Sequence, residues 1–230
     1  MSKSVSLALA RVLAHCGGSP AEAAAYSAGA IAEDPSDPEP YEFLAELRRE
    51  FPGEVAAAVA APSDLWQFVL DAYVRFLDGD MDSAAGRLGS VIGYRPGVAW
   101  ASAPWFGDER FLASVTAAGF SDACLNITDY GADLDNDVVR EHLRPWLRAI
   151  NLVCDREPRA EAMARMAILL RLCGRTDESL ALCDRADSVE RVMLTEVVRA
   201  GTWRFLGDRG QAVAAFERAL RLDRVCCTDR

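Results

Sequence analysis

Four stretches of this chain repeat one spacing of small and apolar residues among polar ones. Each follows a glycine and places three such residues at positions i, i+4 and i+7, as in Ala212, Phe216 and Ala219. The other three sets are Ala23, Ser27 and Ala30; Ala84, Leu88 and Val91; and Ser179, Cys183 and Ala186. Because residues at this spacing share one face of an α-helix, each stretch predicts a helix that packs closely against a neighbour.

Apolar periodicity elsewhere predicts further helices and divides the chain into three parts. We expect helix pairs in residues 1–97 and 138–230, separated by an irregular, aromatic-rich segment at 98–137. The expected helices cover 3–16, 19–33, a stretch that contains Tyr41, Leu44 and Ala45, 54–61, 64–78, 81–93, 137–154, 158–173, 176–187, 189–206 and 209–222. The chain is therefore predicted to be all-α.

The middle segment breaks the repeating pattern. Short helical pieces are expected near 98–103 and 108–118, and Ser121–Asn136 is predicted to be a loop. Pro145 lies inside the next expected helix, where its missing N–H should kink or interrupt the helix. The aromatic side chains of this segment have two interpretations, a divergent repeat with an enlarged core or a pocket or partner interface. They are Trp100, Trp105, Phe106 and Phe111.

The recurring spacing resembles the second helix of a tetratricopeptide repeat, over about 1–96 and 158–222. The best single match runs from Ala200 through Trp203 and Gly207 to Ala212, Phe216 and Ala219, with Arg199 where leucine is usual. The resemblance implies a right-handed superhelix of antiparallel helix pairs. It also implies a concave groove, lined by the first helix of each pair, that binds a peptide or partner protein.

Groove positions transferred from this resemblance change character along the chain. They are Glu39, Glu42, Glu46 and Arg49; Trp66, Val69, Tyr73 and Phe76; Ala164, Ile168 and Arg171; and Val197 and Arg204. Such a groove would run from acidic through aromatic to basic and could orient a bound peptide. The alternative is that the aromatic side chains are core and the charged ones form solvated faces.

The composition of the chain limits the classes of partner that it is expected to bind. The chain has 230 residues, a net charge of −10 and 51% hydrophobic residues, so a basic nucleic-acid-binding face is not expected. No apolar run reaches the roughly 18 residues that a membrane span needs. Lys3 is the single lysine, and this arginine bias is typical of a high-GC bacterium. The seven cysteines have no metal-site spacing, so we expect reduced thiols in a cytoplasmic protein.

Candidate catalytic chemistry is sparse. The two histidines, His15 and His142, have no nucleophile placed to act with them, although Cys16 adjoins His15. Asp133–Asp137 is acidic, but Val138 and Arg144 stand where a calcium loop needs glycine and glutamate. These acids fit a helix N-terminus better. Neither a metal nor another cofactor is therefore expected, and we expect no enzymatic activity.

These observations favour a non-enzymatic adaptor that binds a peptide or partner protein. The alternatives are a regulatory module of a bacterial transcription or biosynthetic system, and a small-ligand binder or enzyme that uses residues 98–137. Self-association through the end of the last repeat is a further possibility. A polar cap at that end would argue against it, and the residues expected to form the cap are Arg221, Asp223, Arg224, Asp229 and Arg230.

Overall fold

The computed structural model describes residues 3–60, 62 and 64–228, and this part of the chain is all-helical. The first six helices are α1 (Lys3–His15), α2 (Pro20–Glu33), α3 (Glu39–Glu50), α4 (Pro52–Val59), α5 (Leu65–Leu77) and α6 (Met81–Tyr94). The middle holds a short 3-10 helix, η1 (Trp100–Ser102), with α7 (Glu109–Ser114) and α8 (Ala117–Thr128). The last five helices are α9 (Asp137–Arg156), α10 (Ala160–Leu172), α11 (Thr176–Val189), α12 (Met193–Phe205) and α13 (Arg209–Thr228).

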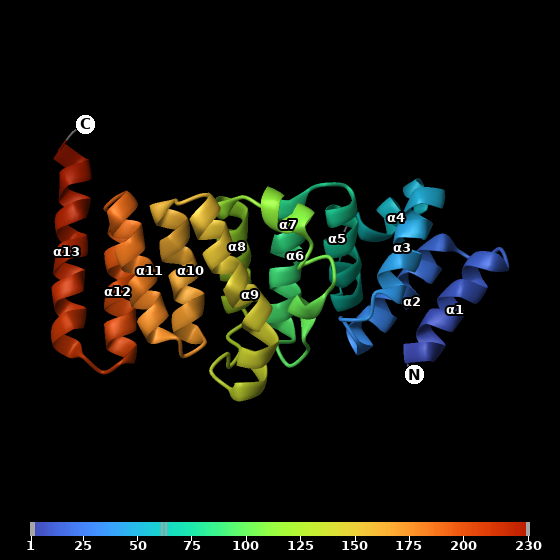
Figure 1. Ribbon diagram of the computed structural model, residues 1–230, viewed down its shortest axis with the longest axis horizontal. Helices are drawn as coiled ribbons and strands as arrows, with labels where there is room; N and C mark the ends of the chain where they lie inside the picture. Colours follow the sequence, from blue (N-terminus) through green and yellow to red (C-terminus); the bar gives the residue numbers. More distant parts are fainter. Residues whose placement is uncertain (1–2, 61, 63, 229–230) are drawn as a thin grey trace.

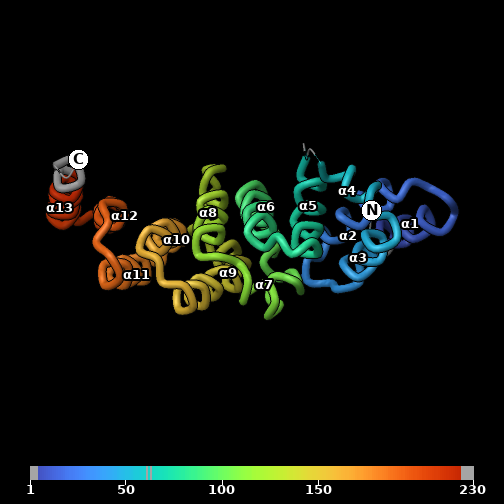
Figure 2. The backbone as a smooth tube through the Cα atoms, turned by 90° about the horizontal axis from the view of Figure 1, so that it is seen from above, coloured from blue at the N-terminus to red at the C-terminus, as the bar shows by residue number. Residues whose placement is uncertain are grey.

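The helices form an elongated row with α1 at one end and α13 at the other (Figure 1). Helices that follow one another pack in pairs, among them α1 with α2, α5 with α6, α10 with α11 and α12 with α13. Figure 2 shows α5, α6 and α8 along one side of the row, with α3, α7, α9 and α11 along the other. The pairs are joined by contacts of α2 with α5, α6 with α8 and α8 with α10.

The recurring small residues lie where helices meet. The sets in α2, α6 and α11 are all buried, and Ser27, Ala84 and Cys183 have almost no exposed surface. In α13, Ala212 and Ala219 are buried, but Phe216 is 43% exposed because α13 is the outermost helix of the row. The spacing therefore identifies helix–helix contacts correctly, and its bulky member is exposed only at the end.

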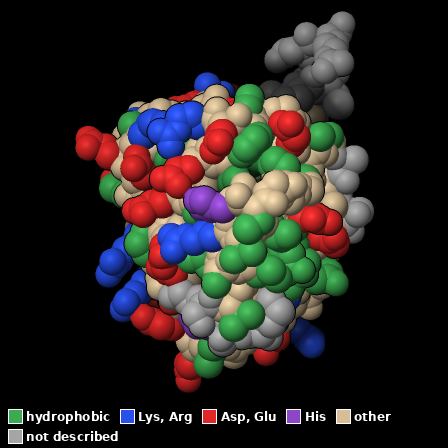
Figure 3. All heavy atoms as spheres, turned by 90° about the vertical axis from the view of Figure 1, so that its right-hand side faces the viewer, with side chains coloured by type: hydrophobic (Ala, Val, Ile, Leu, Met, Phe, Trp, Pro, Cys, Tyr) green, Lys and Arg blue, Asp and Glu red, His purple; other side chains and the backbone are tan. Residues whose placement is uncertain are grey.

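The two ends of the row both expose apolar side chains. At the α13 end, Val213 and Leu220 accompany Phe216 on the surface. Two residues of the predicted polar cap, Arg221 and Asp223, are exposed there as well. The side chains of Arg224, Cys226 and Cys227, together with Asp229 and Arg230, lie outside the described part of the chain. At the α1 end, Val5 and Val12 are exposed, and Figure 3 shows hydrophobic side chains beside charged ones on this face.

The middle segment is more regular than the sequence indicated. The loop predicted at Ser121–Asn136 is wrong over its first half, where α8 runs to Thr128. Thr116 caps this helix by accepting a hydrogen bond from the Gly119 N–H at 2.9 Å. Asp82 of α6 in turn accepts hydrogen bonds from the Thr116 N–H and hydroxyl, at 2.8 and 2.7 Å. A contact across the structure thus fixes the start of α8.

Helix α9 continues through Pro145, so the expected interruption does not occur. Its start agrees with the interpretation of the acidic stretch, because the Asn136 side chain accepts a hydrogen bond from the Val139 N–H at 3.0 Å. Arg140 pairs with Asp135 and Asp137, which accounts for two of the acidic side chains.

Within the described residues, no helix is both long and apolar enough to cross a membrane.

Most of the cysteines that the structure describes are buried. Cys16 is exposed, whereas Cys124, Cys154, Cys173 and Cys183 are free thiols inside the protein. Burial raises the pKa of Cys154 to about 11 and the pKa values of Cys173 and Cys183 to about 12. Burial also raises the pKa of Cys124. Because the thiolate is the reactive form, these four cysteines should be inert at neutral pH.

We therefore expect iodoacetamide at neutral pH to alkylate Cys16 at least about 100-fold faster than the four buried thiols of the folded protein. Peptide mapping by mass spectrometry measures the rates, in a variant with Cys226→Ser and Cys227→Ser. Urea should remove the difference by exposing all five thiols. Similar rates in the folded protein would contradict the burial described above.

Candidate binding surface

Most of the apolar candidates for the binding surface, both those transferred from the tetratricopeptide resemblance and the tryptophans of residues 98–137, lie in the core. Val69, Tyr73, Phe76, Trp100 and Trp105 are each at most 7% exposed. They cannot form an open groove, so their placement agrees with the alternative interpretation as core residues. Trp66 differs. It lies in the first turn of α5, before the buried residues of that helix begin at Val69, and it is 41% exposed.

Ring contacts explain why these side chains are buried. Tyr73 and Phe76 of α5 stack at 5.9 Å, and the Trp105 ring lies 5.3 Å from Phe76. The same cluster extends from Trp105 to Phe106 and on to Trp146 of α9, whose ring stacks on Phe106 at 4.9 Å. Burial raises the pKa of Tyr73 to about 12. Residues 98–137 therefore supply core that joins the two halves of the row.

The predicted groove residues of the later helices differ in exposure. Ile168 and Arg171 of α10 are half-buried, whereas Arg204 of α12 is exposed. The Arg171 guanidinium donates to the Val198 carbonyl oxygen at 3.4 Å, and burial together with nearby Arg204 lowers its pKa. At the other end, Glu39 of α3 is exposed and pairs with Arg11 at 2.7 Å. The acidic-to-aromatic-to-basic surface is thus interrupted where the aromatic side chains enter the core.

A different surface brings an exposed aromatic residue beside open space. One pocket of about 330 Å³ lies between α1, α2 and α5, and a second of about 320 Å³ adjoins it along α2 and α5. Ala25 and Trp66 line both pockets, so Trp66 stands between them. Tyr26, 37% exposed, lines the first pocket beside Gly29, where an added Cβ would meet nothing within 4 Å.

A third pocket, of about 300 Å³, continues this surface toward α6. It shares Asp64 with the second pocket and is lined by Phe68, Tyr94 and Tyr130 among others. Tyr94 and Tyr130 are 62% and 50% exposed, and their rings meet edge to face at 5.9 Å. We call the three adjoining pockets the aromatic groove. It crosses several helices, as a surface for an extended chain would.

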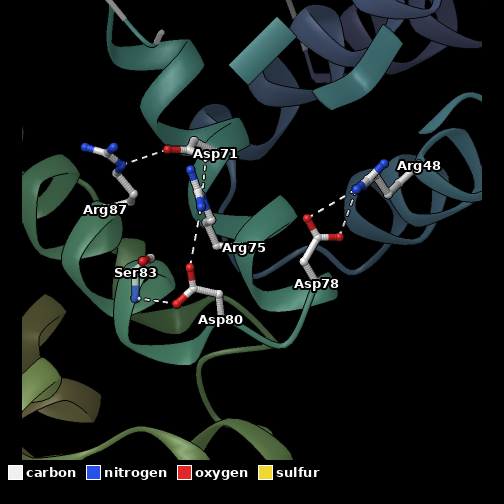
Figure 4. Close-up of polar contacts among 7 residues, drawn as sticks. All are labelled: Arg48, Asp71, Arg75, Asp78, Asp80, Ser83 and Arg87. Atoms are coloured by element: carbon white, nitrogen blue, oxygen red, sulfur yellow. Dashed lines mark hydrogen bonds and ion pairs between the residues drawn. The ribbon is translucent and has the colours of Figure 1, made fainter. Parts of the chain in front are cut away.

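Ion pairs hold the helices that carry this groove (Figure 4). Asp71 of α5 is fully buried and accepts hydrogen bonds from Arg75 Nε at 3.0 Å and Arg87 Nε of α6 at 2.7 Å. The Arg87 guanidinium also lies 5.4 Å from the centre of the Phe68 ring, which lines the third pocket. The buried carboxylate therefore fastens α5 to α6 and fixes a cation against the groove wall.

The resemblance could not identify Tyr26 or the polar lining of this groove. Tyr26 lies on α2, the second helix of its pair, whereas the resemblance implies a groove on first helices. The sequence did contain one signal for this surface: Tyr26 is an aromatic residue that is not part of the buried i, i+4, i+7 set of its helix.

Comparison with protein-family models finds no match, and comparison with curated proteins finds no significant relative. Among the described residues, no group of three or more His, Cys, Asp or Glu could hold a metal ion.

Proposed function

We propose that this chain is a non-enzymatic interaction module that binds an extended segment of a partner protein along the aromatic groove. The observation that carries this proposal is the position of Trp66. Other aromatic side chains of its helix, such as Tyr73 and Phe76, are buried, yet Trp66 is 41% exposed between two adjoining pockets. Tryptophan is one of the residue types enriched among the contacts that contribute most of the binding energy of protein interfaces. An exposed tryptophan beside open pockets is therefore a candidate for such a contact.

The arrangement of helices supports the same proposal. Paired helices joined into a row give a long, rigid surface on which several pockets keep their spacing. The i, i+4, i+7 sets at the helix contacts favour a tetratricopeptide-like stack as the architecture that carries the groove. Binding then depends on side chains at the surface of α2, α5 and α6 and not on the aromatic core beneath them.

We expect Trp66→Ala to weaken binding of a groove ligand on the order of 30-fold, the loss of an interface residue worth about 2 kcal/mol. A displayed library of random peptides is selected against the wild-type protein, and the affinities of enriched peptides are measured for both proteins. Phe216→Ala is the matched control, since Phe216 is similarly exposed, at 43%, on the terminal helix. Peptides that bind the wild type and Trp66→Ala equally would contradict the proposed site.

A further inference from the structure

Each pocket of the aromatic groove is lined by at least one carboxylate. Glu33 lines the first pocket, Glu22 the second, and Asp64 both the second and the third. Among the described residues that line the three pockets, none is Lys, Arg or His. Trp66 and Tyr26, two of the exposed aromatic side chains of the groove, therefore lie in the same pockets as uncompensated carboxylates.

These carboxylates have little competing bonding. Glu33 accepts a hydrogen bond from the Ser6 hydroxyl at 3.4 Å, and one Asp64 oxygen caps α5 by accepting from the Gln67 N–H at 2.9 Å. Within the described part of the chain, neither of them nor Glu22 forms an ion pair. Glu39 on the neighbouring surface is different, because Arg11 already pairs with it at 2.7 Å. The groove thus keeps its negative charge available.

The protein already shows how it holds a cation in such surroundings. Arg87 lies over the Phe68 ring at 5.4 Å while its Nε donates to Asp71 at 2.7 Å. A guanidinium or ammonium over an aromatic face gains electrostatic attraction from the ring, and a nearby carboxylate adds to it. Trp66 shares one pocket with Glu22 and the adjoining pocket with Glu33, so each of these two pockets offers an aromatic ring and a carboxylate.

We propose that the segment bound in the aromatic groove is basic, with an arginine or lysine side chain placed against Trp66 in the pocket of Glu22 or in that of Glu33. This inference rests on the proposed function and names the chemistry of its ligand. Apolar residues on either side of that cation would occupy the pockets beside Tyr26 and Leu70, and the acidic lining would speed association at low salt. An acidic segment would meet like charge from Glu33, Glu22 and Asp64.

The test uses two fluorescein-labelled nonapeptides, one repeating Arg-Ala-Leu and one repeating Glu-Ala-Leu, in fluorescence anisotropy titrations. The key variant is Glu22→Gln with Glu33→Gln, which removes two groove charges and keeps the side-chain shape. Its control is Glu190→Gln with Glu217→Gln. Both carboxylates are exposed, and Glu190 directly follows α11 whereas Glu217 lies on α13. Both variants change net charge equally, so they separate groove binding from the general attraction of a basic peptide to an acidic protein.

We expect the basic peptide to bind about 10-fold more weakly to the groove variant, about 30-fold more weakly to Trp66→Ala, and within about 2-fold of wild type to the control variant. The acidic peptide should not bind. Equal losses in the two charge variants would overturn the inference by showing nonspecific attraction. If the library yields Trp66-dependent peptides that are neutral or acidic, the basic ligand is wrong and the proposed function stands. If no enriched peptide depends on Trp66, both fail.

Discussion

Gly89→Ala is expected to destabilise the protein by about 3 kcal/mol, although glycine-to-alanine changes within helices usually stabilise by about 1 kcal/mol. A Cβ at this position of α6 would lie 3.1 Å from the Ala123 carbonyl carbon of α8 and closer still to its oxygen. Backbone atoms of a packed helix cannot turn aside as a flexible side chain can. The two helices would have to separate, and the aromatic and apolar contacts between them would loosen.

Gly86→Ala provides the matched control for this prediction. Gly86 lies on the same helix and faces the same neighbour, but an added Cβ would meet only the Asn126 Nδ2 atom, at 3.7 Å. This is ordinary contact, so the variant should be as stable as wild type or more stable by up to about 1 kcal/mol. Urea unfolding followed by circular dichroism measures both. Equal stability of the two variants would show that α6 and α8 approach less closely than described here.

The helix pairs were predictable because their signal is local. Small residues at i, i+4 and i+7 sit at helix contacts, and Ser19 caps α2 at the predicted boundary, accepting from the Glu22 N–H at 3.5 Å. Helix α8 was missed because its sequence is rich in poor helix formers such as Gly119 and Asn126. Its apolar residues do follow a helical spacing, with Phe120, Ala123, Cys124 and Ile127 all buried.

The groove was less predictable because burial depends on contacts between distant parts of the chain. Tyr73 and Phe76 have the spacing of either a binding face or a core face. Trp105 decides between them by packing against both rings, and nothing local to α5 indicates that contact. Trp66 stays exposed because it lies off this cluster. Recognising the groove also required Tyr26 and Glu33 of α2 to be placed beside α5, which follows only from the packing of those helices.

Asp71→Ala is expected to cost about 2 kcal/mol of stability, from the loss of two charge-assisted hydrogen bonds to a buried carboxylate. Asp71 has no exposed surface, and it joins Arg75 of its own helix to Arg87 of α6 (Figure 4). The cost is below the usual range for a broken buried pair because Arg75 and Arg87 are 40% and 38% exposed and can turn toward water. Urea unfolding measures the change.

The exposed ion pair of Arg48 and Asp78 provides the comparison for the stability cost of Asp71→Ala. Arg48 contacts both oxygens of Asp78, at 3.1 and 3.2 Å, but the Asp78 side chain is 43% exposed. Asp78→Ala should therefore cost less than about 1 kcal/mol, and high salt should reduce that cost further. The cost of Asp71→Ala should change little with salt. If the two variants lose equal stability, or if salt affects them equally, burial of Asp71 is not what fastens α5 to α6, and the wall of the third pocket is held by apolar packing alone.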